Sequence, residues 1–197
     1  ASPLVIAEAV DAIGGFDAPE AVARLASLAE GDDPALAARA VVALGATGSP
    51  AAAQPLLAAL ARAESDQERA RAVESLGLLA APSAGEPLTR LLAETADPAL
   101  KIRIAVALAA IRDGSARPAL TALLADPVPA VRWYALDALA ALGDAAAAPD
   151  LVAFSLSLAA ARKDQPVEAA LREPDAALAA LSLEARALEV LTQLDAP

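Results

Sequence analysis

The side chains best suited to binding a partner recur at a fixed spacing along the sequence. A basic or aromatic residue stands five positions before a regularly placed apolar residue near the end of a predicted helix. These residues are Arg39, Arg71, Arg103, Tyr134 and Arg186. Five helical steps of about 100° turn this position about 140° away from the apolar one, which points into the core. The column therefore lies off the core face, where it could contact a partner.

A second column stands two positions before the same core residues, on the same helical face. Its members are Asp11, Val42, Glu74, Val106, Asp137 and Glu189. Trp133 lies directly before Tyr134, and these are the sole Trp and Tyr of the chain. Trp, Tyr and Arg are the residues that most often anchor interfaces. We expect Tyr134, with Arg103 and Asp137, to form the centre of a partner-binding surface, while Trp133 either joins it or fills a gap left by alanines.

A structural role for the same arginines is the alternative. Arginines of one repeat could bond aspartates in the turns of adjacent repeats and so build a ladder. Within one helix, Arg71 could pair with Glu74, and Arg186 with Glu189, at a spacing of three residues. The sequence leaves both the ladder and the exposed binding surface open.

Catalytic chemistry has little support in the residue types present. The chain has no histidine and no cysteine, so Ser-His and Cys-His pairs and the commonest metal ligands are absent. Gly14-Gly15, Gly45 and Gly48 fit helix ends and no phosphate-binding loop. The turn residues Asp33, Asp66, Asp97 and Asp126 are expected to cap helices. We therefore expect no enzyme activity, no cofactor and no metal site.

Composition limits the partner and the compartment. The net charge is −11, which disfavours nucleic acid and anionic membranes and favours solubility and cationic partners. No apolar run is long enough for a transmembrane helix. The Ala-Ser-Pro start suits a mature exported chain, but the sequence does not separate a cytoplasmic from an exported protein or fix the oligomeric state.

Three features repeat with almost one period. The anchor residues Leu44, Leu76, Leu108 and Leu139 are 32, 32 and 31 residues apart. The prolines Pro55, Pro87, Pro118 and Pro149 step by 32, 31 and 31, and the four turn aspartates by 33, 31 and 29. Alanine-rich and leucine-rich helices that alternate with turns at this period are typical of an α-solenoid.

With Asp126-Pro127, Val131-Arg132, Ala135, Leu139, Leu142-Gly143 and Pro149, the chain resembles the HEAT-repeat family, in particular the short bacterial HEAT-like repeats. The resemblance implies an all-α fold, a right-handed α-solenoid of about five helical hairpins. It also implies that the second helix of each hairpin lines a concave surface, which would place the arginine column in a groove.

We predict a single domain over residues 1–197. It comprises an unpaired helix at 4–13 and units at about 17–46, 49–80, 82–112, 114–142 and 144–195. The last unit carries an insertion near 162–174, because Leu191 takes the place of Leu139 only after a step of 52 residues. The insertion either caps the array or adds a binding loop.

The predicted function is a non-catalytic scaffold that binds a protein or peptide on its concave face. The candidate contact residues are Arg39, Arg71, Glu74, Arg103, Trp133, Tyr134, Asp137 and Arg186. Alternatives are a HEAT-like enzyme or enzyme accessory subunit of the bilin-lyase type, and a structural assembly subunit. Related repeat proteins that are hydroxylases or DNA glycosylases fit less well, since the chain lacks histidine ligands and a basic balance.

Overall fold

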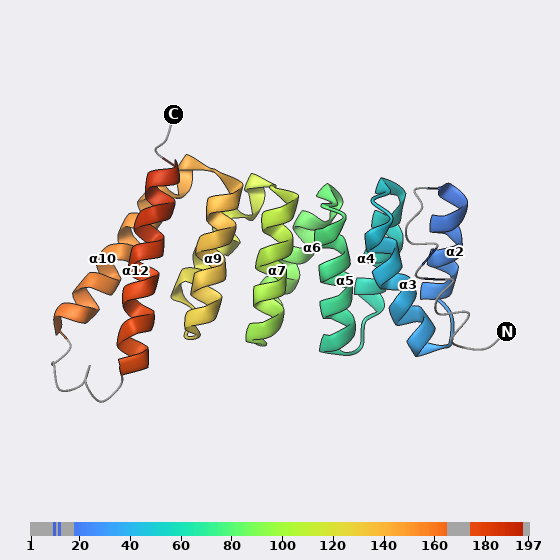
Figure 1. The fold of residues 1–197 in the computed structure, drawn as a ribbon, viewed down its shortest axis with the longest axis horizontal. Helices are drawn as coiled ribbons and strands as arrows, with labels where there is room; N and C mark the ends of the chain where they lie inside the picture. The colour runs from blue at the N-terminus through green and yellow to red at the C-terminus, as the bar shows by residue number, and fades with distance from the viewer. Residues whose placement is uncertain (1–9, 11, 13–17, 165–173, 195–197) are drawn as a thin grey trace. The chain divides into compact units, whose positions relative to one another are not determined.

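The computed structural model describes residues 10, 12, 18–164 and 174–194. The chain divides into two compact units, Ala1–Arg112 and Asp113–Pro197, and each is described by itself. The described residues form α-helices and short 3-10 helices joined by turns, with no strand among them. Helices pair and the pairs stack within each unit, so the predicted all-α solenoid is confirmed (Figure 1).

The first unit is built from three described helix pairs. The pairs are α2 (Pro19–Ala29) with α3 (Pro34–Ala46), α4 (Ala53–Arg62) with α5 (Asp66–Leu78), and α6 (Gly85–Glu94) with α7 (Pro98–Ile111). Short 3-10 turns, η1 (Pro50–Ala52) and η2 (Pro82–Ala84), precede α4 and α6. The second helix of each pair packs against the second helix of the next, so α3, α5 and α7 lie side by side in one layer (Figure 1).

The second unit holds two further pairs. The first joins α8 (Arg117–Ala122) and η4 (Leu123–Ala125) to α9 (Pro129–Leu142), and the second joins α10 (Ala148–Asp164) to α12 (Pro174–Leu194). The turns η3 (Gly114–Ala116) and η5 (Ala145–Ala147) precede α8 and α10. Helix α12 packs against both α9 and α10. The predicted helix at 4–13 and the insertion near 162–174 fall mostly outside the described residues.

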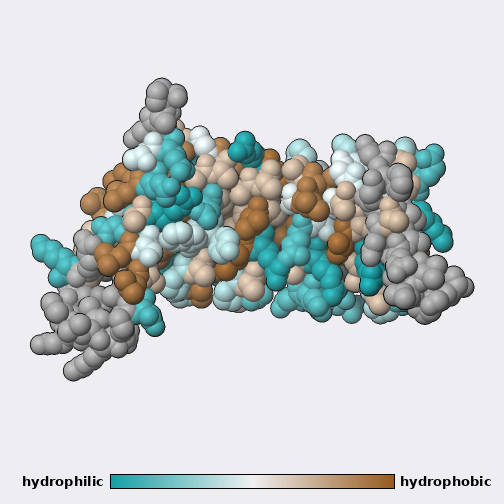
Figure 2. Space-filling view, viewed as in Figure 1, coloured by the Kyte–Doolittle hydropathy of each residue, from teal (hydrophilic) through white to brown (hydrophobic). Residues whose placement is uncertain are grey.

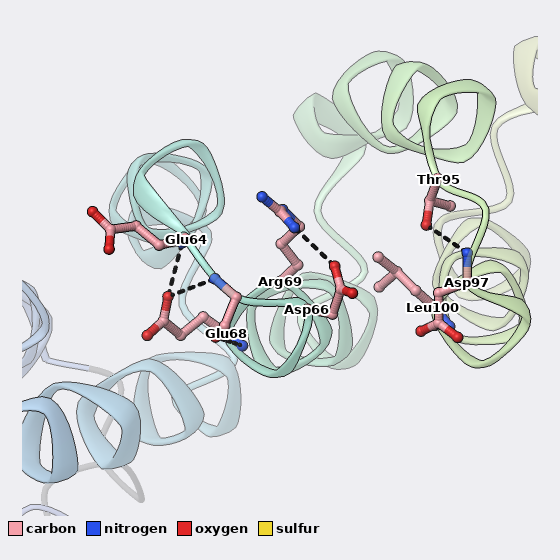
Figure 3. Close-up of polar contacts among 8 residues, drawn as sticks. Glu64, Asp66, Glu68, Arg69, Thr95, Asp97 and Leu100 are labelled. Atoms are coloured by element: carbon pink, nitrogen blue, oxygen red, sulfur yellow. Dashed lines mark hydrogen bonds and ion pairs between the residues drawn. The ribbon is translucent and has the colours of Figure 1, made fainter.

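Turn side chains start several of the second helices. Asp33 accepts hydrogen bonds from the backbone N–H groups of the second and third residues of α3, and Asp97 accepts the equivalent bonds in α7. These are the predicted caps. At α5 the prediction was wrong, because Ser65 is the cap and Asp66 pairs with Arg69 at 2.8 Å (Figure 3).

The fourth turn is arranged differently because it is longer. Asp126 accepts a hydrogen bond from the N–H of Val128 at 2.9 Å, and Val128 precedes α9. Arg132 donates to the carbonyl of Asp126 at 2.8 Å. This arginine, six residues after the turn aspartate, therefore closes its own turn.

The four anchor leucines are fully buried, as expected of the core side of a repeat. In α12 the predicted equivalent, Leu191, is only half-buried, while Val190 is fully buried with Leu183 and Ala187. Val190, Ala187 and Leu183 stand one, four and eight residues before Leu191, and the same three positions are buried before Leu108 and Leu139, so the core face of α12 keeps the predicted register while Leu191 itself is less enclosed.

Two glycines let neighbouring second helices approach closely. A Cβ on Gly45 would lie 2.7 Å from the Cβ and 2.8 Å from the Cα of Ser75. A Cβ on Gly77 would lie 2.9 Å from the Cα and 2.9 Å from the Cβ of Ala107. Gly45 was expected to end its helix but lies inside α3. Contact with α5, a tertiary feature, explains its place.

Candidate partner-binding surface

Candidate residues of the first unit lie on α3, α5 and α7, and those of the second unit on α9 and α12. Each group occupies the layer of second helices, as the repeat predicts. Arg103 and Tyr134 belong to different units, so the structure describes their surroundings separately. The predicted cluster of these two residues with Asp137 stays a prediction.

In the first unit, Arg103 on α7 forms an ion pair and a hydrogen bond with Glu74 on α5. Both side chains are about half exposed. Arg103 belongs to the first column, five positions before a core leucine, in one repeat. Glu74 belongs to the second column, two positions before the core leucine, in the preceding repeat. The pair therefore ties two adjacent second helices together on their off-core face.

The second unit repeats this arrangement with better enclosed side chains. Arg186 on α12 contacts Asp137 on α9, with Nη2 and Nε at 2.6 and 2.7 Å from Oδ1, and it also contacts Glu189 at 2.7 Å. Its side chain is 18% exposed. Burial alone would lower the pKa of Arg186, but the hydrogen bonds to Glu189 and Asp137 raise it above the ordinary value.

The ladder thus differs in its partners from the predicted one. The predicted partners of the arginines were turn aspartates, yet Arg103 and Arg186 bind acids on the preceding second helix. The predicted pair within one helix, Arg186 with Glu189, is present. The sequence contained a signal for these pairs, because Glu74 and Asp137 belong to the second column, which lies on the same helical face as the arginines.

Arg71 and Arg39 have other surroundings. Arg71 is half-buried and lines a cavity of about 220 Å³ in the first unit, together with Arg62, Glu68 and Val41. The positive charge of Arg71 contributes to the lowered pKa of Glu68, after the larger effects of hydrogen bonds from the backbone of Glu64 and Ser65. Arg39 is exposed on α3.

Trp133 and Tyr134 both reach the surface of the second unit. Their exposed fractions are 37% and 40%. Neither side chain is enclosed by the core, which α9 fills instead with Val131, Ala135 and Leu136. The two rings are therefore open to contact beside the Asp137–Arg186 pair, whose carboxylate lies on the same helix.

Two kinds of feature are absent from the described part of the chain. No group of three or more acidic side chains among these residues is arranged to hold a metal ion. None of the described helices is long and apolar enough to cross a membrane.

Comparison with known families agrees with this architecture. A family model described as HEAT repeats matches residues 1–77 and 85–173. The chain belongs to the HEAT-repeat family. A second model, described as the PBS lyase HEAT-like repeat, matches residues 68–94, which include α5 and α6. No curated protein matches the chain.

Among solved structures, this HEAT-repeat chain is similar to one from the complex of CpcE and CpcF of phycocyanin lyase from Nostoc sp. PCC7120. The match covers 99% of this chain and 90% of that chain, with 20% sequence identity and a TM-score of 0.59. At this identity the similarity shows a shared fold. It places the whole sequence within one type of helical-repeat architecture.

Proposed function

We propose that this HEAT-repeat protein is a non-catalytic interaction subunit that binds a partner protein through the second helices, with Trp133 and Tyr134 as anchors. The carrying observation is the exposure of both aromatic rings on α9. Large aromatic side chains gain more from burial at an interface than other residues do, and they lose little conformational freedom.

The polar surroundings of the two rings support this choice. The Asp137–Arg186 pair fixes charged groups at defined positions beside them. An aromatic centre with an ordered polar rim is the usual composition of a protein interface. The solved complex with a similar fold contains two subunits, which adds support for a protein partner.

Site-specific crosslinking tests the proposal. A photo-crosslinking amino acid at position 134 is compared with one at position 156, where Leu156 is 66% exposed on α10. We expect the partner to be captured from position 134 and not from position 156. With the purified partner, Tyr134→Ala should weaken binding by roughly tenfold or more, since interface anchors contribute about 2 kcal/mol or more. Equal capture from both positions would reject α9 as the binding face.

A second candidate is an accessory subunit of a bilin-lyase-type enzyme. The PBS lyase HEAT-like repeat at residues 68–94 and the similar fold in a phycocyanin lyase complex favour it. The test is to incubate the chain, alone and with its captured partner, with a linear tetrapyrrole and an acceptor protein. Covalent pigment on the acceptor only when both proteins are present would support this function. If no pigment is transferred, the result favours the non-catalytic interaction subunit proposed first.

A further inference from the structure

The cavity of about 220 Å³ lies between the first two helix pairs of the first unit. Its walls come from the C-terminal ends of α2 and α4, the first turns of α3 and the start of α5. Most of the lining side chains are small and apolar, and the charged ones belong to Arg62, Glu68 and Arg71. Arg62 and Glu68 are exposed, so the cavity opens to solvent beside them. In Figure 2, hydrophilic residues cover the lower part of α5, where this helix begins.

The repeat itself produces a hollow at this place, but the lining is particular to the first junction. A hollow of about 410 Å³ occupies the equivalent place between the second and third helix pairs. Residues 32 positions apart are equivalent in these pairs, as the anchor leucines show. Glu94 therefore stands in the second hollow where Arg62 stands in the first, and Asp66 where Pro34 stands. The second hollow carries two acids in place of an arginine and a proline.

Arg71 is an arginine of the first column for which the preceding helix supplies no acid. Arg103 binds Glu74, the second-column residue of the preceding repeat. The same place before Arg71 is held by Val42, and Glu74 on its own helix is bound to Arg103. Among the described residues, the guanidinium of Arg71 has no acid at ion-pair distance, and it acts on Glu68 only through space. A half-buried cation loses hydration without a compensating contact, and an anionic ligand would supply that contact.

The other two charged side chains of the cavity are already compensated. The Oε2 atom of Glu68 accepts hydrogen bonds from two backbone N–H groups of its own turn, at 2.9 and 3.3 Å (Figure 3). Arg62 forms an ion pair with Glu30 at 3.2 Å. Arg71 is therefore the charged group that remains for a ligand. A guanidinium binds a carboxylate through two parallel N–H···O bonds.

The size and the apolar lining of the cavity describe the rest of the ligand. A volume of 220 Å³ exceeds the space of about 30 Å³ that one water molecule occupies, and also the apolar cavity of about 150 Å³ that holds benzene. Ala37, Ala38, Ala59 and Val41 line it. A short branched alkyl group would bury its surface against these side chains, and a larger group has no room.

We propose that this cavity binds a carboxylate that carries a short branched alkyl group, with Arg71 as the ligand of the carboxylate. Ala37, Ala38, Ala59 and Val41 surround the alkyl group. Two sources offer this chemistry. One is a free short-chain carboxylic acid, and the other is the last residue of a protein chain that ends in leucine, isoleucine or valine. The aromatic anchors of α9 take no part in this site.

An NMR titration of the full chain with isovalerate tests the site. The backbone amide signals of Ala37, Ala38 and Ala59 should shift and reach saturation. Isovaleramide has nearly the same shape but no charge. It should bind at least tenfold more weakly, because hydrogen bonds between two charged groups are stronger than those to a neutral amide.

Three variants locate the binding. Arg71→Gln should weaken isovalerate binding at least tenfold, because it removes the charge and the paired N–H donors. Arg69→Gln is the matched control, since it makes the same charge change in a side chain that pairs with Asp66 and lines the second hollow. It should bind like the wild type. Ala59→Leu should prevent binding by occupying the cavity, and Leu91 shows that the repeat accommodates leucine at this position. Circular dichroism checks that each variant keeps its helices.

Two peptides separate the two sources of the ligand. Both have one sequence that ends in leucine, and one carries a free terminal carboxylate while the other carries a terminal amide. If the ligand is the end of a protein chain, the free-carboxylate peptide should bind at least as tightly as isovalerate, and the amidated peptide more weakly than either. Binding of isovalerate without binding of the peptides would assign the cavity to a free short-chain acid.

Four results would overturn the proposal. The first is the absence of saturable shifts with both isovalerate and the free-carboxylate peptide. The second is an Arg71→Gln variant that binds like the wild type. The third and fourth are equal binding of the two peptides and equal binding of isovalerate and isovaleramide, because either excludes recognition of the carboxylate. Tyr134→Ala should leave the titration unchanged, which separates this cavity from the surface under Proposed function.

Discussion

Arg103 and Arg186 occupy equivalent positions in two different helices, yet their ion pairs differ in exposure to solvent. The Arg103–Glu74 side chains are 44% and 52% exposed, and the Arg186–Asp137 side chains 18% and 40%. Water screens an exposed ion pair and leaves it a small stabilising effect. The enclosed pair is held by two nitrogen contacts to one oxygen and has less freedom to reorient.

A double-mutant cycle measures this difference in stability. We expect the coupling energy of Arg186→Met with Asp137→Asn to be about 1 kcal/mol or more, and that of Arg103→Met with Glu74→Gln to be about 0.2–1 kcal/mol. Urea unfolding of the four proteins in each cycle gives both values. A coupling for Arg186–Asp137 no larger than that for Arg103–Glu74 would contradict the argument from enclosure.

The contact between Gly45 and Ser75 is a second test at a single position. Gly45→Ala would bring a methyl group within 2.7–3.0 Å of three atoms of Ser75, and overpacking of this kind costs about 1–3 kcal/mol. Alanine regains up to about 1 kcal/mol of helix propensity, so a net loss of about 1 kcal/mol is expected in urea unfolding. Gly114→Ala, which meets open space, is the control and should change stability little.

Among the described helices, α5 has a reciprocal set of side-chain hydrogen bonds at its N-terminus. Ser65 accepts a hydrogen bond from the N–H of Glu68 at 3.2 Å, and Glu68 accepts from the N–H groups of Glu64 and Ser65 at 2.9 and 3.3 Å (Figure 3). This reciprocal arrangement is a capping box. It is local, because the residues of the turn satisfy one another without help from a neighbouring repeat.

The capping box gives α5 a pH dependence. Backbone hydrogen bonds from Glu64 and Ser65 lower the pKa of Glu68 in the folded chain. Its contribution to stability is therefore complete above the unfolded pKa and is lost as the pH falls through the lower folded pKa. We expect the stability difference between wild type and Glu68→Gln to shrink as the pH falls below the ordinary glutamate range.

Urea unfolding at several acidic pH values checks this dependence. The matched control is Glu20→Gln, at a first-turn glutamate of α2 where no side-chain cap is present. Its stability difference from wild type should change less over the same range. A Glu68→Gln difference that is flat with pH would show that the carboxylate does not titrate through the cap.

At the scale of the whole molecule, the contacts described within each unit join neighbouring helix pairs. Stability in such an array is close to a sum of repeat and nearest-neighbour contributions. A change at one interface should therefore open the nearby helices first. Local opening of this kind is observable as hydrogen exchange of backbone amides.

Hydrogen exchange of Gly45→Ala tests this locality. We expect faster amide exchange in α3 and α5, whose contact the methyl group disturbs, with little change in α9 and α12. Gly114→Ala supplies the baseline. Equal acceleration in both units would show that the chain opens as one cooperative body, contrary to the nearest-neighbour expectation.

The sequence alone determined the features that depend on neighbours along the chain. The period of the anchor leucines predicted the paired helices, and Asp33 and Asp97 were identified as caps because a cap binds N–H groups two or three residues away. Off-core placement of Tyr134 also followed from helical geometry, whereas the sequence left Trp133 open between that surface and a gap between repeats. These features need only the backbone of one helix and its turn.

Only the tertiary structure decided the features that depend on two helices meeting. The hydrogen bond between Arg186 and Asp137 joins residues that are 49 positions apart in the sequence, and the one between Arg103 and Glu74 joins residues that are 29 positions apart. Gly45 is required because Ser75 of another helix approaches it. Periodicity gives the face of a helix, but the distance and rotation between helices come from the packing of both partners.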